Sequence, residues 1–190
     1  MQKDAKKLIS STFVKLLSSK PFDKITIKDI VDTCEINRNT FYYHYSDIYG
    51  LLEEIFKTEL NIVIECHRET GSYMDGLIRV AKQAYAHKKF IYNICSSRSY
   101  EYFEHYMYRA CKPIMIDIVT TAAASLNLPD EDIEFIASFY EYACVGVISE
   151  WFKTGMREPP DVFASKMFFV SDGIRRALLL SAKRNLKNSK

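Results

Sequence analysis

The sequence predicts an all-α fold of about nine helices. Glycine and proline are scarce, with six and five respectively among 190 residues, and long stretches contain neither. Within those stretches apolar residues recur every three or four positions, as they do along the buried face of an amphipathic helix. No segment has a convincing strand pattern. The length allows one sizeable core, or a small module joined to a larger one.

The N-terminal quarter is predicted to contain three helices and the start of a fourth. The first spans residues 4–19, with an apolar stripe opposite its lysines. Thr26 is suited to cap a short second helix, and Asp29 makes an approximate capping box with it. Asn37 is placed to cap a third helix over residues 38–44. Ser46 or Asp47 can then cap a long fourth helix.

Five further helices are predicted, at about 74–86, 88–96, from 100 onward, 131–154 and from 160 onward. The helix that begins near Tyr100 is expected to kink or restart at Pro113, because proline lacks the backbone N–H and its ring crowds the preceding turn. Gly155 is placed to close the apolar helix before it. The polar segment 183–190 is expected to fray.

Composition and motifs exclude several functional classes. Residues 1–45 hold eight Lys or Arg against five Asp or Glu, a basic excess suited to binding phosphates. No apolar run could cross a bilayer and no signal-peptide region opens the chain, so a cytoplasmic protein is expected. The five cysteines form no C-x-x-C pair and are expected to be reduced packing residues. We expect no metal site, no cofactor and, without a nucleotide-binding or hydrolase motif, no enzyme.

Residues 26–45 have the length and chemistry of a helix-turn-helix. Two short helices joined by a tight turn lie in the basic part of the chain. In this motif the second helix enters the major groove by its N-terminal residues. Because Arg can bind guanine and Asn can bind adenine bidentately, the base-reading candidates are Asn37, Arg38, Asn39 and Thr40. Phe41 is expected to anchor this helix to the preceding one, and Tyr45 to pack in the core.

The same stretch resembles the signature of the TetR family of transcriptional regulators. The resemblance extends over roughly the first sixty residues, from Phe13 to Leu51-Leu52. It implies a DNA-binding domain at 2–62 and a C-terminal regulatory and dimerisation domain at 63–190. It further implies phosphate contacts by Thr26, Tyr42 and His44, and contacts in or beside the groove by Lys28, Asn37, Arg38, Asn39, Thr40 and Tyr43.

Two positions depart from the family pattern. Glu35 occupies the turn position usually held by glycine, so it either adopts a positive φ at some cost or alters the turn. Ile48 replaces the lysine that usually contacts a phosphate at the start of the fourth helix. The loss of one phosphate contact is expected to weaken DNA binding and to make its salt dependence shallower by about one unit.

The resemblance implies a homodimer in which the last two helices of each subunit form a four-helix bundle. The sequence nominates the same helices, because their apolar residues exceed what a monomer needs to bury; the alternative is a wide intramolecular core. The interface candidates are Phe139, Ala143, Gly146, Val147, Trp151, Met167, Val170, Ile174 and Leu178. Residues 151–160 also resemble, more loosely, a TetR subgroup that includes a regulator-like partner of dihydroxyacetone kinase operons.

Eight aromatic residues lie between positions 85 and 108, more than one helical stripe needs. In the family, a cavity between these helices is the usual effector site, which implies a pocket for a small apolar or aromatic effector. Its candidate residues are Tyr85, Tyr92, Phe103, Tyr106, Met107, Cys111, Tyr140 and Cys144. The alternative is that these side chains belong to the core.

The predicted function is therefore that of a DNA-binding transcriptional regulator, most simply a dimeric repressor that reads a palindromic double-stranded operator and is released by an effector. A second hypothesis is a TetR-like interaction protein, a coregulator with weakened or lost operator binding. Glu35 and Ile48 are the observations that favour it.

Overall fold

The computed structural model describes residues 2–126 and 128–188, and side chains within these ranges except at 2–4, 170–172 and 185–188. The described residues form an all-α fold, as predicted, with nine α-helices, one short 3-10 helix and no strand. The elements are α1 (Gln2–Leu17), η1 (Phe22–Lys24), α2 (Ile27–Cys34), α3 (Arg38–His44), α4 (Ile48–Thr70), α5 (Tyr73–Ala86), α6 (Lys88–Cys95), α7 (Tyr100–Ala123), α8 (Asp130–Lys153) and α9 (Pro160–Asn188).

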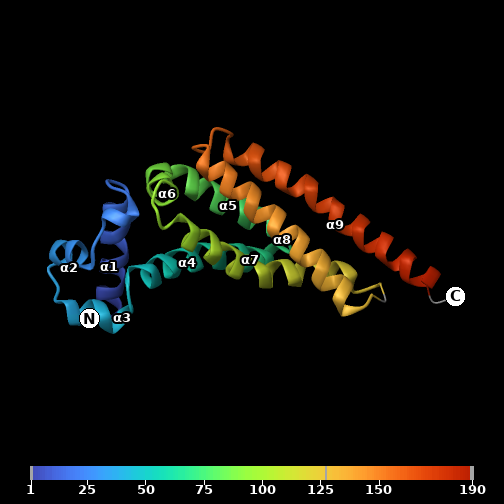
Figure 1. The fold of residues 1–190 in the computed structure, drawn as a ribbon, viewed down its shortest axis with the longest axis horizontal. Coiled ribbons are helices and arrows are strands. Elements are labelled where there is room, and N and C mark those ends of the chain that lie inside the picture. Colours follow the sequence, from blue (N-terminus) through green and yellow to red (C-terminus); the bar gives the residue numbers. More distant parts are fainter. Residues whose placement is uncertain (1, 127, 189–190) are drawn as a thin grey trace.

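The molecule is elongated, with α1, α2 and α3 gathered at one end (Figure 1). The long helix α4 leads from this end into the rest of the protein, where α8 and α9 run side by side and α9 ends at the opposite extremity. The three N-terminal helices thus form a compact module, and α4 is its direct covalent link to the body.

One continuous hydrophobic core joins the module to the body. It includes Phe13 and Phe41 from the module, and Phe103 and Trp151 from the body. A second, smaller cluster packs α7, α8 and α9 together farther along the molecule, around Val119 and its neighbours. Because burial of apolar surface is the main stabilising term, the module is held to the body by packing as well as by the chain.

Helix α7 is continuous across Pro113, so the restart expected there does not occur. A proline removes one backbone hydrogen bond from the ladder. Met107 is buried in the main core on one side of Pro113, and Met115 is buried in the smaller cluster on the other. Burial of both flanks holds the two halves of the helix in one element.

Helix α9 continues to Asn188, beyond the point where fraying was expected at 183–190. Within this segment Arg184 Nη2 donates to Asp132 Oδ1 at 2.8 Å, which connects the end of α9 to the start of α8. Ser181 Oγ donates to the other carboxylate oxygen at 2.7 Å. Residues 189–190 lie outside the described residues. In the ranges that are described, no helix has both the length and the hydropathy needed to cross a membrane.

Candidate nucleic-acid interface

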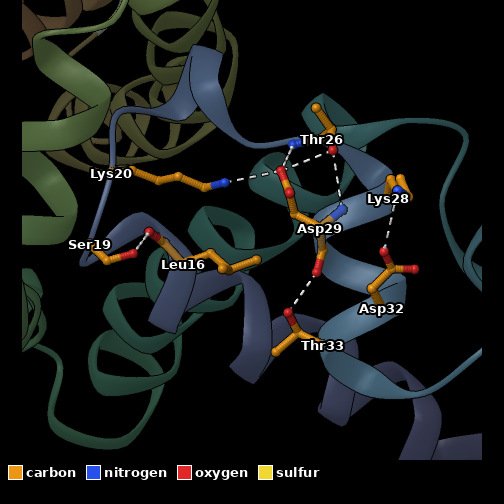
Figure 2. A network of polar contacts seen from close by, with 8 residues as sticks. All are labelled: Leu16, Ser19, Lys20, Thr26, Lys28, Asp29, Asp32 and Thr33. Atoms are coloured by element: carbon orange, nitrogen blue, oxygen red, sulfur yellow. Dashed lines mark hydrogen bonds and ion pairs between the residues drawn. The ribbon is translucent and has the colours of Figure 1, made fainter.

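A reciprocal cap at Thr26 fixes the start of α2, as the sequence predicts. Thr26 Oγ1 accepts from the backbone N–H of Asp29 at 3.1 Å, and Asp29 Oδ2 accepts from the backbone N–H of Thr26 at 2.8 Å (Figure 2). Lys20 Nζ donates to the same carboxylate at 3.0 Å. The Thr26 N–H first, and then Lys20, lower the pKa of Asp29 to about 2. This capping box satisfies backbone donors that the helix leaves unpaired.

The turn between α2 and α3 contains a strained residue. Glu35 adopts a left-handed conformation, with φ 54° and ψ 38°, so the positive φ considered from the sequence is the one observed. Ile36 N donates to Val31 O at 3.0 Å, and Glu35 N donates to Asp32 O at 3.4 Å. These two bonds form a Schellman motif, whose left-handed position is usually glycine. The turn therefore keeps the left-handed geometry, with a side chain where glycine would be unstrained.

Helix α3 is capped by Asn37 and anchored by Phe41. The Asn37 Oδ1 atom accepts from the Thr40 backbone N–H at 2.8 Å and from the Thr40 hydroxyl at 3.1 Å. Phe41 is fully buried, and its ring centroid lies 5.8 Å from that of Tyr45, which is also buried. The anchoring and core roles expected for these two rings are confirmed. The opposite face of the short helix is consequently held toward solvent.

The nine residues proposed to contact DNA lie together on α2, the turn and α3. Arg38, Asn39, Tyr42 and Tyr43 are exposed, as is Lys28, whose Nζ is 3.9 Å from Asp32 Oδ2. His44 is half-buried at the last turn of α3. The oxygens of Thr26 and Asn37 already serve as caps. Since a bidentate contact with adenine needs the amide oxygen, only the NH2 group of Asn37 remains available while the cap is intact.

Side-chain contacts connect the module with α4, α4 with the body, and the module with the body directly. Lys6 Nζ lies 2.7 Å from Glu54 Oε1 on α4, and Tyr49 Oη lies 2.9 Å from Ser99 Oγ. Asn93 Nδ2 on α6 donates to the Leu17 carbonyl at the end of α1, at 2.7 Å. The partners are 48 to 76 positions apart in the sequence. Sequence reasoning missed them because no local spacing relates residues so far apart.

Only part of the nominated dimer surface is exposed. Phe139, Ala143, Gly146 and Val147 are exposed on α8, and Met167 is half-buried against the core. The nomination of Trp151, Ile174 and Leu178 is corrected, because all three are buried inside the subunit. The side chain of Val170 lies outside those described.

The reason for the correction is intramolecular packing. The Trp151 ring stacks on Phe163 at 4.3 Å, and its Nε1 donates to the Glu158 carbonyl at 3.0 Å. Ile174 and Leu178 pack in the smaller cluster. On α8 and α9, the large exposed apolar side chains that the nomination omitted include Phe135, Tyr142, Phe168, Phe169 and Leu180.

The structure divides the residues nominated for an effector pocket among the two hydrophobic clusters, a groove and the surface, which corrects the expectation of one shared pocket. Phe103 and Met107 are buried in the main core, against which Tyr85 and Cys111 pack. Tyr140 and Cys144 pack against the smaller cluster, and Tyr92 is exposed on α6. The high aromatic content of 85–108 thus serves mainly to fill the core, as in the alternative considered from the sequence.

Tyr106 alone among the nominated residues lines a groove between α4 and α7. The groove has a volume of about 330 Å³, and its lining combines apolar residues such as Leu60 and Ile64 with the charged Lys57. Glu53 lies at its edge and accepts hydrogen bonds from Tyr102 at 2.8 Å and Arg109 at 2.7 Å, bonds that join the two helices. Burial raises the pKa of Tyr106 to about 12, so its hydroxyl remains a neutral hydrogen-bond donor at neutral pH.

Family comparison agrees with this architecture. Residues 11–55 match the model of the bacterial regulatory proteins of the tetR family. Residues 72–173, more than half of the chain, match the model of a transcriptional regulator C-terminal region associated with it. The chain belongs to the TetR family of transcriptional regulators. As a TetR regulator, it has its helix-turn-helix inside the N-terminal match and α5–α8 inside the C-terminal one.

Solved structures similar to this TetR regulator share its fold. The dihydroxyacetone kinase operon activator DhaS superposes with a TM-score of 0.65 and 19% identity, covering 94% of this chain and 96% of that one. A TetR transcriptional regulator from Streptococcus agalactiae 2603V gives a TM-score of 0.59 and 17% identity, covering 92% and 94%. A TetR regulator from Rhodococcus sp. RHA1 gives 0.54 and 16%, covering 95% and 97%.

A curated relative is longer than this TetR regulator. YxbF of Bacillus subtilis (strain 168), described as an HTH-type transcriptional regulator, is 19% identical over 170 residues. The match covers 88% of this chain but 45% of YxbF, so the chain spans less than half the length of that relative.

Proposed function

We propose that this TetR regulator acts as a homodimer that binds a palindromic operator through α3. The observation that carries the proposal is the exposed pair Arg38 and Asn39, held at the first turn of a capped and core-anchored helix. Both side chains suit base edges in the major groove. A fixed backbone with free polar side chains at the N-terminus of the second helix is the arrangement that base reading requires.

The proposed roles divide along the motif. Lys28, Arg38, Asn39 and Tyr43 contact bases or lie beside the groove, and Tyr42 contacts phosphate. Four further residues lie at the ends of the two helices. Asn37 and Thr40 mainly shape the start of α3. Thr26, at the start of α2, and His44, at the end of α3, contact phosphates. The corresponding division of the chain is a DNA-binding domain at 2–62 and a regulatory and dimerisation domain at 63–190.

The exposed aromatic face of α8 and α9 is the proposed dimer surface. Phe135 is 73% exposed and Phe139 is 61% exposed on α8, while Phe169 is 81% exposed on α9. Large apolar side chains exposed in this number on two neighbouring helices are typical of an interface between subunits. Gly146, where an added Cβ would meet no atom within 4 Å, leaves room for close approach of a partner helix. Dimerisation then places two α3 helices about 34–36 Å apart, in successive major grooves.

Dimerisation can be tested by one charge substitution. Phe139→Glu is expected to convert the dimer to a monomer in sedimentation velocity, because a carboxylate would be desolvated at the centre of the interface. Leu8→Glu, which places the same charge at an exposed apolar position of α1, is the matched control and is expected to remain dimeric. A wild-type chain that sediments as a monomer at micromolar concentration would overturn the dimer proposal.

Effector control is proposed at the groove between α4 and α7. An apolar or aromatic molecule between Leu60, Ile64 and Tyr106 would push α4 away from α7, and α4 leads directly to the DNA-binding module. The proposed outcome is repression that is relieved by the effector. To change the DNA-bound fraction from 99% to 1%, the effector must favour the released form by about 5.5 kcal/mol.

Operator binding can be tested with the DNA that flanks the gene for this chain. Fluorescence anisotropy at moderate salt is expected to detect a specific complex that competitor DNA of unrelated sequence does not displace. Arg38→Ala is expected to cost about 1–3 kcal/mol and to relax specificity at one base pair. Lys112→Ala, which removes an exposed positive charge on α7, outside the helix-turn-helix, is the comparison and is expected to leave operator affinity unchanged. The proposal fails if the wild type binds the flanking DNA no better than the competitor.

A second candidate is an activator or coregulator. It is favoured by the similarity to DhaS, which is named as an operon activator, and by the strained Glu35 and the apolar Ile48 in the DNA-binding module. Deletion of the gene distinguishes the two candidates. Transcription of the neighbouring genes rises on deletion of a repressor and falls on deletion of an activator.

A further inference from the structure

A second open cavity lies where the end of α1 meets α6 and the turn between α8 and α9. Its volume is about 450 Å³, within the range of small-molecule sites. The α1/α6 cavity is lined by Ser18, Ser19, Lys88, Lys89, Tyr92, Asn93, Gly155 and Met156. It shares no residue with the groove between α4 and α7. An occupant would contact both the DNA-binding module and the body.

The charge of the α1/α6 cavity is positive. Lys88 is half-buried, with its Nζ 3.2 Å from the Met156 carbonyl oxygen and 3.6 Å from the centroid of the Tyr85 ring. Among the residues that the structure describes, neither Lys88 nor Lys89 forms an ion pair, and no Asp or Glu lines the cavity. A partly desolvated ammonium without a carboxylate partner favours an anion beside it.

The remaining lining groups suit a ring and hydroxyl groups. Tyr92 is 59% exposed and offers an aromatic face on which a planar ring can stack. The hydroxyl protons of Ser18 and Ser19 are donated to the carbonyls of Val14 and Leu16, at 2.8 and 2.7 Å. Their oxygen lone pairs are therefore the available groups, and they accept hydrogen bonds from a sugar hydroxyl or a ring N–H.

From the two lysines, the exposed ring and the hydroxyl acceptors, we infer that the α1/α6 cavity binds a phosphorylated ring compound of nucleotide size. The phosphate lies between Lys88 and Lys89, and the ring lies on Tyr92. A charge-assisted bond of this kind strengthens binding more than a neutral one does. The inference concerns ligand binding alone, so it does not depend on the operator proposal.

Isothermal titration of the full chain with AMP and UMP tests this inference without DNA. Saturable binding is expected, weakened about tenfold by Lys88→Met, which corresponds to about 1.4 kcal/mol. Lys89→Met is expected to weaken binding as well. Because Lys89 is exposed, this variant is expected to fold even if Lys88→Met does not. Lys112→Met on α7, which removes an exposed lysine outside the cavity lining, is the matched control and is expected to have no effect.

Two component ligands complete the experiment. Inorganic phosphate and adenosine are each expected to bind more weakly than AMP, because each reaches only one part of the cavity. The inference is overturned if neither nucleotide binds, or if binding is unchanged in both lysine variants. Equal affinity for inorganic phosphate and AMP would overturn the role of Tyr92 in holding a ring.

Discussion

Replacement of Glu35 by glycine is expected to stabilise the protein. Glu35 has φ 54° and ψ 38°, a left-handed conformation that costs an L-residue about 1–2 kcal/mol. Glycine removes this cost but adds about 0.4–1 kcal/mol of conformational entropy to the unfolded chain. The backbone bonds of the Schellman motif involve no side-chain atom, so they remain in the variant. The net gain expected is about 0.5–1 kcal/mol.

Urea unfolding measures this gain at a fixed protein concentration, because the apparent stability of the proposed dimer would depend on concentration. The gain corresponds to a rise in Tm of roughly 1–4 °C for a chain of this size. Glu35→Gln is the matched control: it removes the same charge but keeps a side chain at positive φ, so no comparable gain is expected. If Glu35→Gly is no more stable than Glu35→Gln, backbone strain at Glu35 does not lower the free energy of unfolding.

Four further substitutions test the module and the body. Thr26→Ala removes the two bonds that the Thr26 hydroxyl makes with Asp29, to its carboxylate and from its backbone N–H, and is expected to lower the free energy of unfolding by about 1 kcal/mol in urea titration. Asp29 has a pKa lowered from 3.8 to about 2, so its carboxylate stabilises the fold above pH 3.8, and this stabilisation is lost as the pH falls through about 2. The stabilities of the wild type and Asp29→Asn should therefore converge in acid, and a constant difference from pH 7 to pH 2 would contradict that cause. Gly76→Ala would bring a Cβ to 2.6 Å from the Val63 Cα and is expected to cost about 1–3 kcal/mol in thermal melts, whereas Gly146→Ala meets no atom within 4 Å of the same subunit and should not destabilise the monomer. Equal melting temperatures for the two alanine variants would show that α4 and α5 are not in close backbone contact.

The local signals in the sequence were sufficient to predict the DNA-binding module. Thr26, Asn37 and Asp47 cap α2, α3 and α4 through their own side chains, and the atoms involved are three positions apart. Gly71 and Gly155 end helices with φ 72° and 77°. Such interactions depend on neighbours in the chain, so they can be recognised without knowledge of the fold.

The body was predicted less completely, because periodicity shows which face of a helix is apolar but not what covers it. Helix α8 is apolar on more than one side: Val145 is fully buried, while Phe139 is 61% exposed. Nothing in the order of residues distinguishes Trp151, packed on Phe163 of its own subunit, from the exposed Phe139. For the same reason, aromatic residues of the core such as Phe103 were expected to line a pocket.

For this protein, the sequence by itself determined the helix-turn-helix and its caps, because these follow from local backbone geometry and hydrogen bonding. It left two conformations open at Glu35, and the structure shows the one with positive φ. Only the tertiary structure decided which apolar side chains of α8 and α9 remain exposed. It also decided where cavities lie, at α4/α7 and at α1/α6, and that Asn93 meets the end of α1. These features depend on how close-packed helices approach one another, and contacts between residues tens of positions apart decide that approach.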